Sequence, residues 1–153
     1  MIRLPKRILF SIKAVLAIAC HTGGSPVRSI DITEREGIPT RYLEPVLQQL
    51  VREGILVGIR GPAGGYQLAN APDKIKLGDV VRVVEGSKSR DETTDDTRGY
   101  GLGGRVVHLL WVDLQKEMMR RLDAISIEDL RAKAMRPVTK ARTTERRARR
   151  VSA

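Results

Sequence analysis

Apolar residues recur every three or four positions along much of this 153-residue chain, a spacing that places them on one face of an α-helix. The pattern predicts helices over residues 6–22, 29–36, 40–53 and 77–85. The side chains expected to be buried are Ile8, Ile12, Val15, Leu16 and Ala19 in the first helix and Leu43, Leu47 and Leu50 in the third. Glycines follow the first three helices and are expected to end them, and Ser29 is a candidate N-cap of the second.

The pattern changes between the third and fourth helices. Two short runs, 55–60 and 66–69, are apolar and strand-like, and the sequence GPAGG separates them. This combination predicts a β-hairpin, because glycine adopts the positive φ angles of a tight turn without steric cost. The helices over 29–36 and 40–53, joined by a glycine turn, fit a helix-turn-helix. With the hairpin added, the predicted fold is mainly α with a small β-wing, a winged helix-turn-helix.

The second half of the chain is organised differently. Residues 87–104 are rich in glycine, serine and acids, which predicts a flexible loop. A long amphipathic helix is predicted over 105–125, and we expect it to meet a second copy because so small a domain offers little core to cover it. The stripe of this predicted dimerisation helix is Val107, Leu110, Trp111, Leu114, Met118, Leu122 and Ile125. Ser126 is expected to cap a last short helix over 126–134.

The formal charge of +10 is unevenly distributed. Residues 136–150 hold seven lysines and arginines and one acid, whereas residues 1–135 hold 21 basic and 17 acidic residues. A basic arm of this kind binds polyanions by releasing their condensed counterions. The alternative is a solvated, disordered tail that binds nothing.

Composition also excludes several classes of protein. The chain has one cysteine, Cys20, so an intramolecular disulfide or a cysteine-based metal cage is impossible, and a buried, inert thiol is favoured over a redox switch. No apolar run is long enough to span a membrane, and Lys13 interrupts the first one, which favours a cytoplasmic core helix over a secretory signal. No catalytic set or phosphate loop is present, so the chain is not expected to be an enzyme.

Four strings in this order resemble a known family: DITEREGIPTRYLEPVLQQLVREGIL, RGPAGGY, GDVVRVVEG and HLLWVDL. They are similar to the Rrf2 family of bacterial transcription regulators over about residues 6–133. The resemblance implies a homodimeric winged-helix repressor or activator whose long helices cross at the dimer interface and whose wings enter the minor groove. The chain would then divide into a DNA-binding domain over 1–86, a loop over 87–104, a dimerisation segment over 105–135 and a basic tail over 136–153.

The chain departs from the family at one functional position. Members that sense through an iron–sulfur cluster carry three cysteines in the loop before the long helix, and residues 87–104 contain none. Arg105 stands where the last of those cysteines would be, and His108 stands where some members supply a histidine ligand. One histidine cannot hold a cluster without thiolates. We therefore expect no metal and no other cofactor.

The residues expected to contact DNA come from three places. The exposed face of the third helix offers groups that read base edges in the major groove. The wing tip lacks bulky side chains, so its backbone can approach DNA while an arginine enters the minor groove. Basic residues near helix starts are candidate phosphate contacts. The full set is Lys6, Arg7, Arg28, Thr40, Arg41, Tyr42, Glu44, Gln48, Arg60, Gly61, Pro62, Gly64 and Gly65.

Alternatives stay open at several points. The wing glycines could serve the turn alone, and the polar face of the third helix could be merely solvated. Pro45 would kink this helix if it begins near Thr40, unless the regular helix begins later. The chain is expected to be a homodimeric transcription regulator, and more specifically a repressor, that binds double-stranded DNA. Its rivals are an architectural nucleic-acid binder driven by the tail and a regulator controlled by a protein partner or a small-molecule effector.

Overall fold

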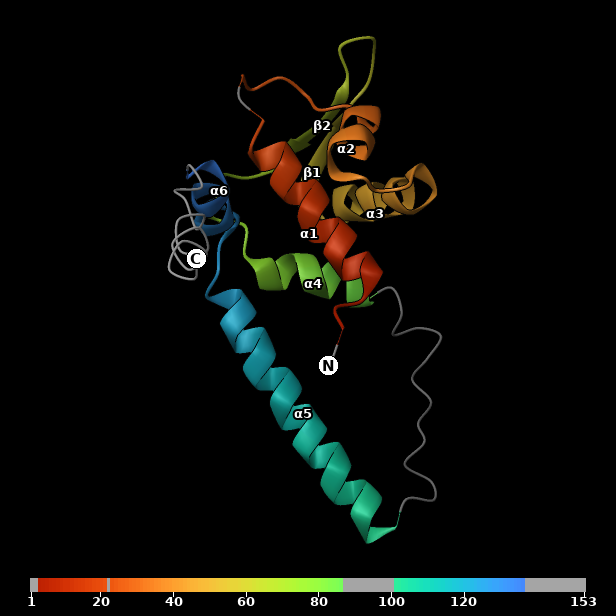
Figure 1. Cartoon of the computed structure of the whole chain (residues 1–153), viewed down its shortest axis with the longest axis vertical. Coiled ribbons are helices and arrows are strands. Elements are labelled where there is room, and N and C mark those ends of the chain that lie inside the picture. Colours follow the sequence, from red (N-terminus) through yellow and green to blue (C-terminus); the bar gives the residue numbers. More distant parts are fainter. Residues whose placement is uncertain (1–2, 22, 87–100, 137–153) are drawn as a thin grey trace, which may run out of the picture.

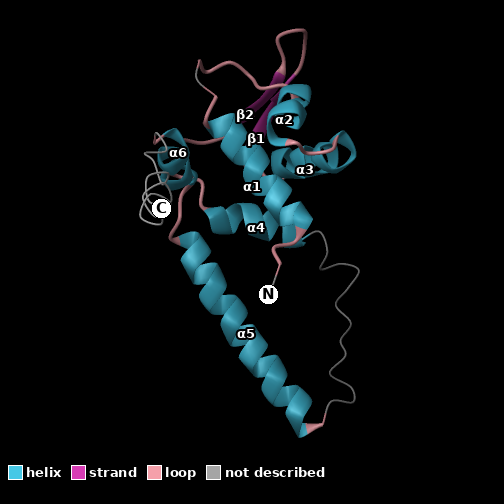
Figure 2. Ribbon diagram, viewed as in Figure 1, coloured by secondary structure: helices cyan, strands magenta, loops and turns pink. Residues whose placement is uncertain are grey.

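The computed structural model describes residues 3–21, 23–86 and 101–136, so most of the predicted loop over 87–104 and almost all of the tail over 136–153 lie outside it. Within these ranges the chain forms a helical body with a small sheet, and one long helix projects from the body (Figures 1 and 2). The helices are α1 (Lys6–Ala19), α2 (Ser29–Glu36), α3 (Thr40–Arg52), α4 (Leu77–Gly86), α5 (Leu102–Asp123) and α6 (Ile127–Met135). The strands are β1 (Leu56–Ile59) and β2 (Gly65–Leu68).

Helix α1 lies at the centre of the body and packs against α2, α3, α4, α6 and β2. Its buried face was only partly predicted. Ile8 and Val15 are buried as expected, but the face turns toward Ala14 and Ile18, whereas the predicted Ile12, Leu16 and Ala19 are half-buried. The helix ends at Ala19, three residues earlier than predicted.

The helix-turn-helix consists of α2 and α3. Gly37 ends α2 in the left-handed conformation, with φ of 65°, as expected from its position. The prediction that Ser29 caps α2 is wrong, because Arg28 is the N-cap and no side chain caps this end. Helix α3 begins at Thr40 and continues through Pro45, which excludes a later start.

The wing is an antiparallel hairpin in which Leu56 pairs with Leu68 and Ile59 pairs with Gly65. A further contact joins it to the segment before α2. The backbone N–H of Val27 donates to Tyr66 at 2.9 Å, and that of Tyr66 donates to Val27 at 2.8 Å. Residues 27 and 66 therefore fix the wing to the entrance of the helix-turn-helix.

Helix α5 is anchored to the body at its C-terminal end. Leu122 packs on a small apolar cluster formed by Ile8, Val81 and Val84 of α1 and α4. The backbone N–H of Leu77 donates to Ile125 at 2.8 Å. The rest of α5 extends away from the body (Figure 1). It begins at Leu102, so Gly103 and Gly104, which were expected in the loop, are part of the helix, and Gly101 is its N-cap.

Helix α6 has the N-cap that the sequence predicts. The Ser126 hydroxyl accepts from the backbone N–H of Asp129 at 3.0 Å, and the Asp129 carboxylate accepts from the backbone N–H of Ser126 at 2.9 Å. This reciprocal arrangement is a capping box. No helix in the described part of the chain is long and apolar enough to cross a membrane.

Candidate nucleic-acid interface

Helix α3 has a sharply divided surface. Leu43, Val46, Leu47 and Leu50 are buried, as the leucine spacing predicts. On the opposite side an exposed row runs along the helix at intervals of four, three and four residues. We call it the outward row, and it consists of Arg41, Pro45, Gln48 and Arg52. Sequence reasoning named Arg41 and Gln48 but missed Arg52, although its spacing of four from Gln48 places it on the same face. Thr40 is exposed beside this row, whereas Glu44 is half-buried.

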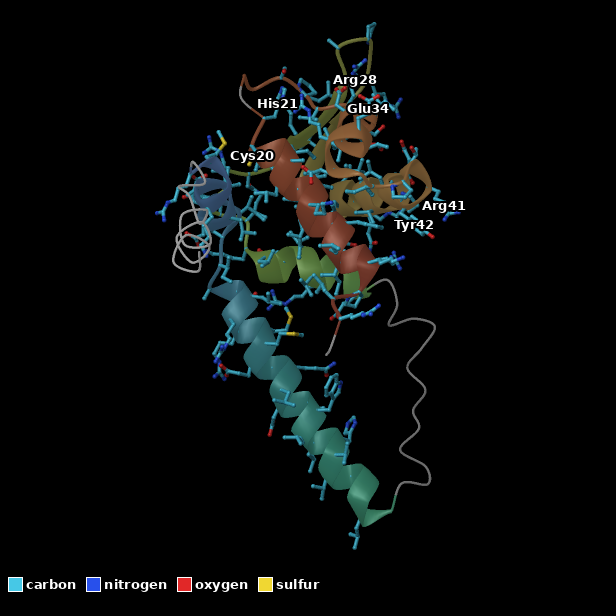
Figure 3. The ribbon with its side chains drawn as sticks, viewed as in Figure 1. Cys20, His21, Arg28, Glu34, Arg41 and Tyr42 are labelled. Carbon is cyan, nitrogen blue, oxygen red and sulfur yellow. The ribbon has the colours of Figure 1, made fainter. Side chains whose placement is uncertain are left out.

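Aromatic contacts hold the start of α3. The Tyr42 ring lies 5.9 Å from the ring of Phe10 in α1, and the Arg41 guanidinium carbon lies 4.7 Å from the centre of the Tyr42 ring. This guanidinium contact has the geometry of a cation–π interaction. Figure 3 shows Arg41 and Tyr42 together at the surface. The tyrosine therefore orients Arg41 as well as presenting its own hydroxyl.

The wing glycines divide into two groups. Arg60, Gly61 and Pro62 are exposed at the tip. By contrast, Gly64 is buried, and a Cβ there would collide with the carbonyl oxygen of Ile59. At Gly65, where φ is 153°, a Cβ would lie 2.6 Å from the carbonyl oxygen of Val27. Gly64 is therefore required by the packing within the hairpin, and Gly65 by the close approach of Val27 from the segment before α2.

The three predicted phosphate contacts have different surroundings. Lys6 is exposed at the start of α1. Arg7 is half-buried, and its Nη2 donates to the side-chain oxygen of Gln49 at 3.4 Å. Arg28 is exposed near the wing (Figure 3). Its guanidinium donates to both carboxylate oxygens of Asp31 at 3.2 Å. These hydrogen bonds lower the pKa of Asp31. Lys6 and Arg28 remain at the surface, whereas Arg7 faces α3.

Helix α5 exposes a large apolar surface in this chain. We call it the α5 apolar face, and it consists of Leu102, Val106, Val107, Leu109, Leu110, Trp111, Leu114 and Met118. Each of these side chains is about half exposed or more. Leu122 and Ile125, the last two residues of the predicted dimerisation stripe, are half-buried against the core of their own chain. Leu102, Val106 and Leu109 were not predicted.

The helix-turn-helix, its outward row and its wing define a winged-helix transcription regulator that binds DNA. A family model described as an iron-dependent transcriptional regulator, Rrf2, matches residues 4–133, and the chain belongs to this family. It is 36% identical over 127 residues to the HTH-type transcriptional regulator IscR of Aliivibrio salmonicida, covering 79% of this chain and 72% of that protein. The family resemblance and the fold class predicted from the sequence are thus confirmed.

Solved structures of the same family have the same fold. The structure of T. potens IscR matches with a TM-score of 0.71 at 30% identity, covering 87% of this chain and 88% of that one. CymR, the global cysteine regulator of B. subtilis, matches with a TM-score of 0.66 at 28% identity, covering 87% and 98% of the two chains.

The family description implies iron, but the side chains of this protein do not fit an iron–sulfur cluster. The described residues contain no group of three or more histidines, cysteines and acids that could hold a metal ion. The single cysteine, Cys20, lies at the C-terminal end of α1, whereas His108 is exposed on the projecting helix α5. Burial raises the pKa of the half-buried Cys20 thiol, which disfavours the thiolate that a cluster requires.

Proposed function

We propose that this protein is a cytoplasmic, sequence-specific transcriptional repressor that binds double-stranded DNA as a homodimer, without an iron–sulfur cluster. The observation that carries the proposal is the outward row of α3, which presents base-reading side chains next to a wing whose tip carries Arg60. Helix α5 projects away from this surface (Figure 3). One part of the chain is thus free to meet DNA while another is free to meet a second copy.

The side chains on and beside the outward row match the donors and acceptors of base edges. Arg41 can bind guanine O6 and N7, Gln48 can pair with adenine, and Glu44 can accept from cytosine N4. Thr40 lies beside them at the start of α3. These groups would read the major groove.

The wing and the flanking residues would add sequence-independent and shape-dependent contacts. Arg60 would enter a narrow minor groove, with Gly61 and Pro62 keeping the tip slim. Lys6, Arg28 and Tyr42 would contact phosphate and so position the protein without specifying sequence. Gly64 and Gly65 would hold the hairpin in shape rather than touch DNA.

The α5 apolar face supports the homodimer. A contiguous apolar surface of this size is unusual on a monomer and marks an interaction site. In the distal part of α5, the exposed side chains of Leu109, Val106, Leu110 and Val107 follow one another around one broad arc of the helix, and Arg105 and His108 are exposed on the remaining side. A second α5 helix crossing the first would cover these side chains. Two recognition helices would then face half-sites about 34–36 Å apart on one side of the duplex.

The first experiment is selection of bound duplexes from a random pool by the purified protein at physiological salt, with iron and sulfide assayed on the same sample. A partly palindromic consensus and no stoichiometric iron are expected. Enrichment of no sequence, with binding that disappears as salt rises, would replace the repressor by an architectural nucleic-acid binder.

Substitutions then test the interface on the selected duplex. Arg41→Ala is expected to weaken binding by about 1–3 kcal/mol through the loss of a bidentate contact with a base in the major groove. Arg60→Ala is expected to weaken binding through the loss of the contact in the minor groove. Lys133→Ala, which removes an exposed charge from α6, is the control and should bind as the wild type does. Unchanged binding by Arg60→Ala would remove the wing from the interface.

A further inference from the structure

Gln49 of α3 has both ends of its side-chain amide engaged by other helices. Its oxygen accepts a hydrogen bond from Nη2 of Arg7 in α1 at 3.4 Å. Its Nε2 donates to the backbone carbonyl of Val83 in α4. The orientation of the amide is determined, because a guanidinium can only donate and a carbonyl can only accept. Gln49 therefore joins three helices through one side chain.

The contact with α4 lies in the wall of a groove. This groove, of about 820 Å³, runs along α3 from Pro45 to Glu53 beside the end of α4, and Gln49 and Val83 both line it. Apolar packing alone permits small rotations of one helix on another, whereas a hydrogen bond is directional and fixes a register. Gln49 is the next residue after Gln48, so any rotation of α3 at this point moves the outward row.

Helix α4 is also the element to which α5 is attached. Arg82, adjacent to Val83, donates to the Asp123 carboxylate at the end of α5 at 2.5 Å. A Cβ on Gly78 would collide with that carboxylate, so α4 and the end of α5 are in close contact. Helix α5, which carries the α5 apolar face, and helix α3, which carries the outward row, are thus both fixed to α4.

We propose that Gln49 is a positioning residue for DNA recognition. It holds α3 against α1 and α4, so that the outward row keeps one angle relative to the wing and to the projecting helix. Arg7 belongs to this arrangement rather than to the phosphate contacts. The proposal rests on the proposed function of the outward row as the base-reading surface.

Two substitutions separate the bonds of Gln49 in the full chain. Gln49→Glu keeps an acceptor for Arg7 but places a carboxylate oxygen against the carbonyl of Val83. Gln49→Leu removes both bonds at similar volume. Ser126→Ala is the matched control, because it removes the α6 cap and lowers stability without touching α3 or its contacts. Binding is measured on the selected duplex and on a scrambled duplex, at a temperature where every variant is folded.

Both Gln49 variants are expected to lose roughly 3–30-fold in affinity for the selected duplex while binding the scrambled duplex as the wild type does. Ser126→Ala should keep the wild-type ratio between the two duplexes. The proposal is wrong if the Gln49 variants keep that ratio, or if Ser126→Ala loses as much of it. A wild-type protein without sequence preference would instead contradict the proposed function.

Hydrogen exchange in the absence of DNA tests the positioning directly. The amides of α3 are expected to exchange faster in Gln49→Glu than in the wild type, whereas those of α6 exchange at the same rate. Equal exchange of α3 in the two proteins would overturn the proposal, whatever the DNA measurements give.

Discussion

Gly65 lies where the wing approaches the segment before α2 closely enough to exclude a side chain. Its φ of 153° and the nearby carbonyl of Val27 leave no room for a side chain. Gly65→Ala is therefore expected to lower the free energy of unfolding by about 1–3 kcal/mol. Gly58→Ala in the neighbouring strand meets nothing within 4 Å and should have little effect. Urea unfolding of both variants makes the comparison, and equal stability of the two would contradict it.

The capping box of α6 predicts a dependence of stability on pH. Hydrogen bonds from the Ser126 backbone N–H and side chain lower the pKa of Asp129 below its usual range. Because its pKa is lower in the folded than in the unfolded state, the carboxylate stabilises the fold above the unfolded pKa of about 3.9, and this contribution is lost as pH falls through the folded pKa. The pKa of Asp123 is lowered in the same way by its hydrogen bond with Arg82.

The free energy of unfolding is accordingly expected to fall as the pH is lowered from 5 toward 2. Asp129→Asn should show a shallower decline, because the variant has no carboxylate to protonate at this cap. Urea titrations at a series of pH values measure both curves. A wild-type protein with constant stability over this range would show that the cap does not act through the charge of Asp129.

For single residues, the sequence predicted which side of a helix is buried and which is exposed. It did not predict which side chains contact one another. The spacing of Leu43, Leu47 and Leu50 gave the buried side of α3 correctly, and hence the exposed positions of Arg41 and Gln48. No spacing indicates that Arg7 contacts Gln49, which is 42 residues away. The collision that requires Gly65 depends in the same way on Val27, which only the tertiary fold brings near.

At the scale of elements, helix type and order were predictable and helix ends were less so. Helix α5 begins at Leu102 although Gly103 and Gly104 have low helix propensity. Its C-terminal end was also misplaced, because Ile125 continues the apolar spacing beyond Asp123. That spacing reports burial, and Ile125 is half-buried against the body of its own chain.

The α5 apolar face predicts the assembly state of the protein. Leu110→Asp would place a carboxylate in the middle of a surface that we propose to be covered in a homodimer. Burying an unpaired charge there is unfavourable, so this variant is expected to sediment as a monomer while the wild type sediments as a dimer. Met135→Asp, at an exposed apolar position of α6, should remain a dimer. A dimeric Leu110→Asp protein would place the interface elsewhere.

At the scale of the whole molecule, the distribution of charge separates two modes of binding. The tail carries much of the excess positive charge, while the outward row and the wing carry the groups that can discriminate bases. Deleting residues 136–153 should therefore weaken binding to every duplex and reduce its salt dependence, by a slope of about 0.9 for each phosphate that the tail neutralises in the intact protein. Preference for the selected sequence should survive the deletion. Loss of that preference with the tail would favour the architectural alternative, and titrations at several salt concentrations decide between them.

The packing of Gly64 and Gly65 has a consequence for how such proteins diverge. Gly64 is required by a contact inside the hairpin and Gly65 by a contact with Val27, whereas Arg60 is exposed at the wing tip. In a lineage that ceased to bind DNA, selection on Arg60 would relax at once, but the two glycines would persist for as long as the hairpin folds. The two glycines are therefore expected to be retained wherever the hairpin folds. The neighbouring Arg60 is expected to be retained only where the wing still binds DNA.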